Sequence, residues 1–170
     1  VNEKSADVIY TDEDKVSMDG QHYFDPNFKP DYNLFRLREN NYICHIFVVR
    51  KSLADKVGYL RTEFDGAQDF DFIFRCCEQA DSIVHIPRVL YHWRCHMDST
   101  AADPESKKYA YEAGRNAIRE HYQRLGIDAS VEMTDRPGWY RSYVKIQGNP
   151  MISIIIPNKD HVDDLELCLF

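Results

Sequence analysis

Apolar residues gather in short runs rich in β-branched side chains, separated by polar stretches. The clearest runs are 7–11, 43–49 and 151–156. Runs of this length and composition are typical of β-strands. The last run is apolar without alternation, which is typical of a central parallel strand buried on both faces. Further extended segments are expected at 82–86 (ending at Pro87), 89–93, 127–133 and 139–144.

Helical periodicity appears between these runs. Ile73, Cys76, Cys77 and Ala80 follow the i, i+3, i+4, i+7 spacing and predict a helix over 69–80. A second helix is expected from an N-cap at Asp103 followed by Pro104 through to Leu125, with Gly126 as its stop and a buried stripe made mostly of alanines. A short helix is expected over 52–57, closed by Gly58. Strands mixed with helices predict an α/β fold, a mixed sheet flanked by helices.

Asp12, Glu13 and Asp14 directly follow the first predicted strand. Ligands of α/β sheets bind at the carboxyl ends of strands, and alternate residues of an extended chain point to one side. Asp12 and Asp14 are therefore expected to face one cation while Glu13 points away. Carboxylate oxygens suit Mg²⁺ or Mn²⁺, whose coordination substrate phosphates usually complete. The alternative interpretation is a solvated acidic turn.

Composition narrows the class of protein. The chain has 170 residues, of which 44% are hydrophobic and 29% charged, as in an ordinary globular protein. The net charge of −7 argues against a nucleic-acid-binding protein, which normally carries a basic patch. Five cysteines without a CxxC pair favour reduced thiols and a cytoplasmic location, with the inner face of the membrane as a variant of it. No apolar run approaches the ~18 residues that span a bilayer.

Several motifs occur in a characteristic order. They are the strand with Asp12-Glu13-Asp14, then Gly66-Ala67-Gln68-Asp69-Phe70-Asp71, then the segment 85–96 with His92-Trp93-Arg94-Cys95-His96, then Ser99-Thr100-Ala101. This set resembles the C-terminal half of a family-2 glycosyltransferase of the GT-A fold. The run 152–160 resembles the start of another such domain, as in bacterial tandem glycosyltransferases of surface-polysaccharide assembly.

The resemblance implies a partial GT-A-like sheet that lacks the N-terminal nucleotide-binding half. Residues 1–100 would be the end of one glycosyltransferase domain, 101–150 a helix and connector, and 151–170 the start of a second, truncated domain. The implied reaction moves a sugar, with inversion, from a nucleotide-diphospho-sugar to a hydroxyl of a saccharide or lipid-linked saccharide. It implies Mn²⁺ or Mg²⁺ as cofactor. The implied site residues are Asp69 as catalytic base, Asp12, Asp14 and His96 at the metal, Arg94 at the donor phosphates, and Asp71 and Trp93 on the acceptor side.

Structural roles compete with these assignments. Asp69 is also a good helix N-cap, and Asp71 would complement the helix dipole in the first turn. Alternate positions of one extended segment hold His92, Arg94 and His96, so these side chains could line the solvent-exposed face of a half-buried strand. Trp93 would then point inward and pack in the core, with stacking on a sugar as its alternative. The motif also departs from the family at one position, because Gln68 stands where a glutamate is common.

Two other functions compete with sugar transfer. A glycoside hydrolase would need two matched carboxylates across a cleft and no metal. A non-catalytic module would fit a chain that lacks half of the donor site, and we expect the fragment alone to be inactive. The apolar strand at 152–156 could also pair with the exposed sheet edge, within one chain or between two copies.

Overall fold

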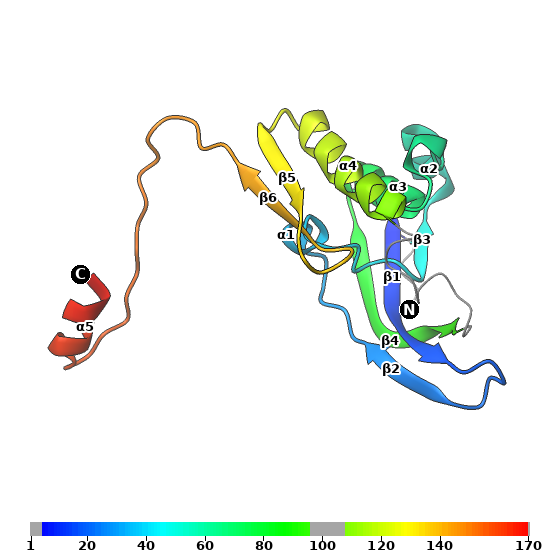
Figure 1. The fold of residues 1–170 in the computed structure, drawn as a ribbon, viewed down its shortest axis with the longest axis horizontal. Coiled ribbons are helices and arrows are strands. Elements are labelled where there is room, and N and C mark those ends of the chain that lie inside the picture. The colour runs from blue at the N-terminus through cyan, green and yellow to red at the C-terminus, as the bar shows by residue number, and fades with distance from the viewer. Residues whose placement is uncertain (1–4, 96–107, 170) are drawn as a thin grey trace.

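The computed structural model describes residues 5–95 and 108–169. Figure 1 shows a sheet covered on one side by helices, and a hairpin from which an extended segment leads to a terminal helix. His96, Asp103 and Ser99 to Ala101 lie outside the described residues. The elements are β1 Val8–Val16, β2 Tyr23–Asn27, α1 Leu34–Leu37, β3 Phe47–Val49, α2 Lys51–Val57, η1 (a 3₁₀ turn) Thr62–Phe64, α3 Gln68–Gln79, β4 Ile83–Arg94, α4 Lys108–Arg124, β5 Ala129–Met133, β6 Tyr140–Val144 and α5 Val162–Leu169.

Strand β1 is the centre of a four-stranded mixed sheet. Along one edge it pairs in parallel with β4 over its whole length. Along the other edge it pairs antiparallel first with β3, up to Tyr10, and then with β2, from Glu13 onward. Within residues 5–95 and 108–169, no strand pairs with Thr11 or Asp12 on that second edge, so β1 changes neighbours there. The prediction of a mixed α/β sheet flanked by helices is confirmed.

The acidic residues lie inside β1 and not after it. The prediction ended the strand at residue 11, but β2 and β4 continue the pairing to Val16. Asp12 is 2% exposed and Glu13 9%, so neither belongs to a solvated turn. The apolar pattern underestimated the strand because its polar half is covered by other segments of the chain.

Strand β4 runs through Pro87, where the sequence predicted a stop. The register with β1 shifts at this point, since Ile86 pairs with Thr11 whereas Val89 pairs with Asp12. Pro87 and Arg88 therefore form a bulge. A bulge leaves residues out of the ladder, which suits a proline because it has no N–H to donate.

Helices α3 and α4 form the core above the sheet. The predicted stripe on α3 is confirmed at Ile73, Cys76 and Cys77, which are at most 9% exposed. Helix α4 ends close to the predicted stop, and Gly126 has the positive φ of +66° that suits a helix C-terminus. Leu125, predicted to be buried, is 44% exposed. Among the described residues, no helix is long and apolar enough to cross a bilayer.

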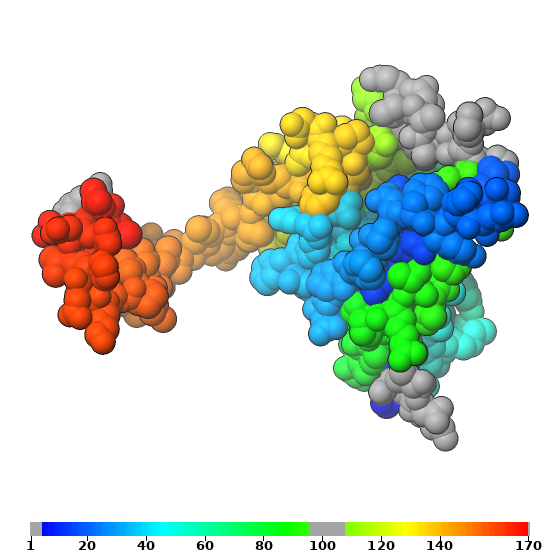
Figure 2. All heavy atoms as spheres, turned by 90° about the horizontal axis from the view of Figure 1, so that it is seen from below, coloured from blue at the N-terminus to red at the C-terminus, as the bar shows by residue number. Residues whose placement is uncertain are grey.

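One predicted strand is shorter than expected, and another does not form. Within 43–49 only β3 is a strand, and Cys44 has a positive φ of +35° that no strand residue adopts. The run 151–156 forms no strand, and Met151, Ile152, Ile154 and Ile155 are 78–94% exposed. Figure 2 shows the segment that contains this run extending away from the body of the molecule. An apolar run predicts strand propensity, but a strand also needs a hydrogen-bonding neighbour.

Asp71 anchors a buried ion-pair network on α3. Its carboxylate accepts hydrogen bonds from Arg61 and Arg75, and its side chain is fully buried. Arg75 also donates to the carbonyl oxygens of Val57, Gly58 and Tyr59 at 2.6–2.9 Å. The network therefore ties the loop after α2 to α3. Burial alone would raise the pKa of Asp71, but the two guanidinium groups outweigh it and hold the pKa below its usual value.

We predict that Asp71→Asn lowers the free energy of unfolding by about 3–5 kcal/mol, because two arginines lose a buried partner. Denaturant unfolding monitored by circular dichroism measures the loss. Because the pKa is lowered in the folded state, this stabilisation is full above the unfolded value of ~3.9 and is lost as the pH falls through the folded value. Asp55→Asn, which breaks an exposed pair with Lys51, is the control and should change stability little. Equal effects of the two substitutions would contradict the prediction.

The exposed run 151–156 makes self-association a prediction that can be tested. Pairing of this run with an open sheet edge would bury apolar side chains and satisfy backbone groups. We expect association that increases with concentration in analytical ultracentrifugation, and its loss in Ile154→Lys. A monomer at all concentrations would rule out pairing between copies.

Candidate functional site

Asp69 lines a pocket of ≈ 320 Å³. His45, Leu60 and Tyr91 are also part of the pocket lining. Helix α3 starts at Gln68 with Ala67 as its N-cap, so the N-cap alternative for Asp69 is wrong. Its Oδ2 atom accepts a hydrogen bond from the Asn41 amide at 2.9 Å. No described residue donates to Oδ1. The carboxylate is therefore held by one oxygen and has the other available to a ligand.

Glu13, and not Asp14, is the acidic strand residue connected to this pocket. Its Oε2 atom lies 3.1 Å from His45 Nδ1, and His45 lines the pocket with Asp69. Tyr91, the register partner of Glu13, stacks on His45 with ring centroids 4.7 Å apart. Burial works against ionisation of Glu13, but the bond from His45 and the charge of Lys29 hold its pKa below the usual value.

Lys29 lies buried behind the pocket wall, with no exposed side-chain surface. Its ammonium donates to the carbonyl oxygens of Ile43, at 2.7 Å, and His45, and lies 3.5 Å from Glu13 Oε2. Burial lowers the pKa of Lys29, and the attraction of Glu13 opposes this effect. An ammonium has three N–H groups, and these three oxygens match them. The loop before β3 is thus tied to β1.

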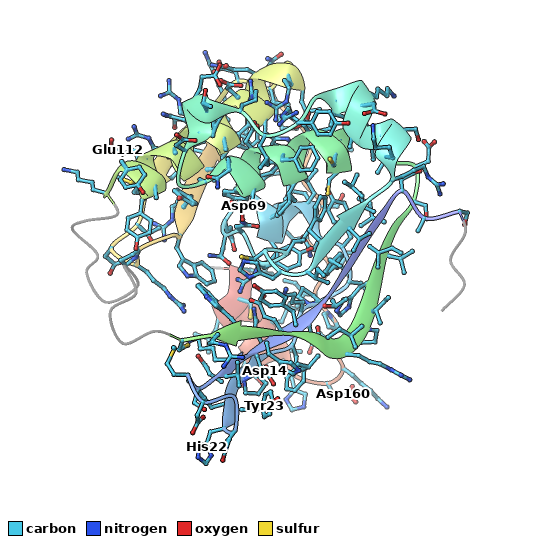
Figure 3. All side chains as sticks on the ribbon, turned by 90° about the vertical axis from the view of Figure 1, so that its right-hand side faces the viewer. Asp14, His22, Tyr23, Asp69, Glu112 and Asp160 are labelled. Atoms are coloured by element: carbon cyan, nitrogen blue, oxygen red, sulfur yellow. The ribbon has the colours of Figure 1, made fainter. Side chains whose placement is uncertain are left out.

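Asp14 faces away from the pocket. It pairs with His92 at 2.5 Å, and His92 packs against Tyr23. Neighbouring residues of a strand project to opposite faces, so Asp14 and Glu13 cannot share one. Figure 3 shows Asp69 at the start of α3 and Asp14 on the other side of the β1–β4 pair. Glu13, and not Asp14, therefore lies on the side of the pocket that contains Asp69, and a cation at Asp14 stays a prediction.

Asp12 is engaged in the fold. Its Oδ1 atom accepts from the Lys29 backbone N–H at 2.9 Å and from His85 Nε2 at 2.8 Å. Asp12 and Asp14 therefore pair with different histidines. Within residues 5–95 and 108–169, no three His, Cys, Asp or Glu side chains are placed to hold a metal ion. The third predicted ligand, His96, lies outside the described residues. Metal binding by Asp12 and Asp14 therefore stays a prediction.

The remaining predicted residues have different surroundings. Asp71 is fully buried between Arg61 and Arg75, which supports its structural role and contradicts an acceptor contact. Trp93 is 43% exposed with its ring edge-on to His45 at 5.3 Å, so the expected core packing is wrong. The Arg94 guanidinium donates to the carbonyl oxygens of Met18, at 2.7 Å, and Ser17, in the turn after β1. Its contact with phosphate stays a prediction.

Cys44 adds a thiol to the pocket lining, 3.3 Å from His45 Nδ1. Burial, with the acidic side chains of Asp69 and Glu13, raises its pKa to about 12. A thiol with such a pKa is not ionised at neutral pH and is a poor nucleophile. Asp69 is the one carboxylate among the described lining residues. A hydrolase mechanism needs a facing pair of carboxylates, so this pocket does not favour it.

Sequence reasoning missed Glu13, Lys29 and His45. Lys29 stands in a proline- and aromatic-rich stretch without periodicity, and His45 stands in a run interpreted as a strand. The alternation of side chains along a strand predicted Asp12 and Asp14 as site residues, because this rule takes no account of which strand covers which edge of the sheet. The one available signal was a histidine and a lysine that interrupt apolar or aromatic stretches, and this signal is weak.

Comparison with known proteins identifies two similar bacterial proteins. No protein-family model matches the chain. An uncharacterized protein (y4gI) of Sinorhizobium fredii (strain NBRC 101917 / NGR234) is 44% identical over 163 residues, which cover 94% of this chain and 18% of that protein. O-antigen biosynthesis protein RfbC of Myxococcus xanthus is 40% identical over 156 residues, covering 92% of this chain and 12% of that protein. The chain thus spans less than a fifth of the length of these relatives.

Proposed function

We propose that this chain forms the acceptor side of an inverting glycosyltransferase that works in bacterial surface-polysaccharide synthesis. One observation carries the proposal. The Asp69 carboxylate, held through one oxygen by Asn41, faces a pocket whose wall is tied to the acidic strand β1 through His45 and Glu13. A fixed carboxylate beside a pocket is the arrangement that a general base for an alcohol requires.

The proposed chemistry needs a single proton acceptor on this side. Asp69 Oδ1 takes the proton of the acceptor hydroxyl as its oxygen attacks the anomeric carbon of the donor. The new C–O bond forms on one face while the bond to the diphosphate breaks on the other, and the electron pair leaves with the diphosphate. Attack opposite the leaving group inverts the anomeric configuration. The donor is a nucleotide-diphospho-sugar, and the acceptor is a saccharide or lipid-linked saccharide.

The relatives support the polysaccharide part of the proposal. One of them is named for O-antigen biosynthesis, and its match extends over almost the whole of this chain. The motif order described in the sequence supports the transferase part. Because the chain spans only a small share of its relatives, we assign the activity to the full-length protein and expect the donor to contact residues beyond those described. A cytoplasmic location, with the inner face of the membrane as a variant, stays part of the proposal.

Metal dependence stays a prediction from the sequence. The described residues bring Asp12 to His85, whose Nδ1 atom lies 3.4 Å from Asp31, and Asp14 to His92, but no three of these side chains are placed to hold a metal ion. The proposed proton transfer to Asp69 does not involve the metal.

We predict that Asp69→Asn in the full-length protein lowers kcat for sugar transfer by ~10²–10⁴-fold, because an amide cannot accept the proton. Donor binding, measured by calorimetry, should not change. Asp65→Asn is the matched control, since this exposed carboxylate lies just before α3 and outside the pocket lining. Full activity of Asp69→Asn would remove Asp69 from the role of base.

We also predict that EDTA abolishes transfer by the full-length protein and that Mn²⁺ or Mg²⁺ restores it. Asp14→Asn should weaken Mn²⁺ binding, measured by electron paramagnetic resonance, whereas Asp19→Asn in the following turn should not. Undiminished transfer in EDTA would show that the reaction does not need the metal.

A further inference from the structure

The bond between Glu13 and His45 orients an imidazole in the pocket that Asp69 lines. We infer that His45 Nε2 binds the acceptor sugar, accepting a hydrogen bond from the hydroxyl next to the one that Asp69 deprotonates. This inference rests on the proposed function and adds a substrate class to it: the acceptor unit carries two neighbouring hydroxyl groups.

The surroundings of His45 determine its tautomer. An ionised carboxylate only accepts hydrogen bonds, so Nδ1 carries the proton that is donated to Glu13 Oε2 at 3.1 Å. In the neutral ring, Nε2 then holds a lone pair and is an acceptor. Its one hydrogen-bond contact among the described side chains is the Cys44 thiol, at 3.5 Å, a weak donor that a hydroxyl group can replace. The atom is therefore available to a hydroxyl group.

Two aromatic rings hold the imidazole in place, and a hydrogen bond holds the backbone of the same residue. Tyr91 stacks on the ring with an interplanar angle of 15°, and Trp93 meets it edge-on at 62°. The backbone carbonyl of His45 accepts a hydrogen bond from Lys29. Despite these contacts the side chain is 33% exposed. A histidine with only a packing role in the core would be buried, like His121, which is 0% exposed.

One short loop positions both groups that would contact the acceptor. The Asn41 side-chain amide donates to Asp69 Oδ2, and its Oδ1 atom accepts from the Cys44 backbone N–H at 3.3 Å. His45 follows directly in the chain. Asp69 and His45 line one pocket and both act as acceptors there. Two acceptors in one pocket match two hydroxyl donors on one sugar ring, and two bonds orient the ring better than one.

His45 keeps its protonation state in this scheme. The proton of the reacting hydroxyl goes to Asp69, and the neighbouring hydroxyl keeps its proton while donating to Nε2. His45 is thus expected to act on acceptor binding and specificity more than on the chemical step. Glu13 acts through His45 and is a positioning residue.

His45→Asn tests the inference in the full-length protein. The asparagine amide nitrogen reaches the place of Nδ1 and keeps the bond to Glu13, but nothing replaces Nε2. We expect the acceptor KM to rise about 3- to 10-fold, the loss of one hydrogen bond, with kcat and the donor KM within about twofold of wild type. His22→Ala, which removes an exposed histidine in the turn after β1, is the control and should leave all three values unchanged.

Acceptors that lack one hydroxyl provide a second measurement. The analogue without the neighbouring hydroxyl should raise the KM of the wild type about as much as His45→Asn does. The two changes should not add when they are combined, because both remove the same bond. Thermal unfolding of His45→Asn should match the wild type, which separates a binding effect from a folding effect.

The outcomes separate the two proposals. The inference is overturned if His45→Asn keeps the wild-type acceptor KM, or if its loss and that of the deoxy analogue are fully additive. The proposed function is upheld separately, if the wild type transfers sugar and Asp69→Asn does not. If the wild-type full-length protein transfers no sugar from any nucleotide-sugar tested, the proposed function fails and the role of His45 fails with it.

Discussion

The buried ammonium of Lys29 is the interaction on which the site depends. It lies where β1 changes its neighbour from β3 to β2. An unpaired charge there would cost several kcal/mol, so the surrounding groups must compensate it. Glu13 and the carbonyl oxygens of Ile43 and His45 do so. The loop that precedes β3 can therefore adopt few arrangements, because moving it would leave Lys29 without partners.

This constraint reaches the pocket through the same loop. Asn41 at one end of the loop holds Asp69, and His45 at the other end bonds to Glu13. Cys44, between them, has a backbone φ of +35°, a region that non-glycine residues rarely adopt. Such conformations persist only where the surroundings impose them, and they are concentrated at functional sites. The groups proposed to contact the acceptor are thus placed before any ligand arrives, which lowers the cost of orienting them.

The two faces of β1 separate different tasks. Glu13 serves the pocket, while Asp14 and His92 form a pair on the opposite face. The pocket's other wall is supported by the network of Asp71 and Arg75, since Arg75 binds the carbonyl oxygens of the loop that leads to Leu60. Asp71, the second aspartate of the motif that contains Asp69, is therefore part of the scaffold. Its charge is used to fix the loop geometry.

The sequence by itself determined the class of fold and the elements whose signals are local. The stripe on α3, the glycine after α4 and the position of Asp69 at the start of α3 follow from periodicity and backbone preference, which neighbouring residues decide. Tertiary structure alone decided that β1 continues through Asp14, that Glu13 faces the pocket and that Lys29 lies buried behind it. These outcomes depend on which strand covers which edge, and on a bulge at Pro87 that shifts the register, and contacts between distant segments are not encoded in any local pattern. The run 151–156 shows the same limit, because propensity without a pairing partner did not produce a strand.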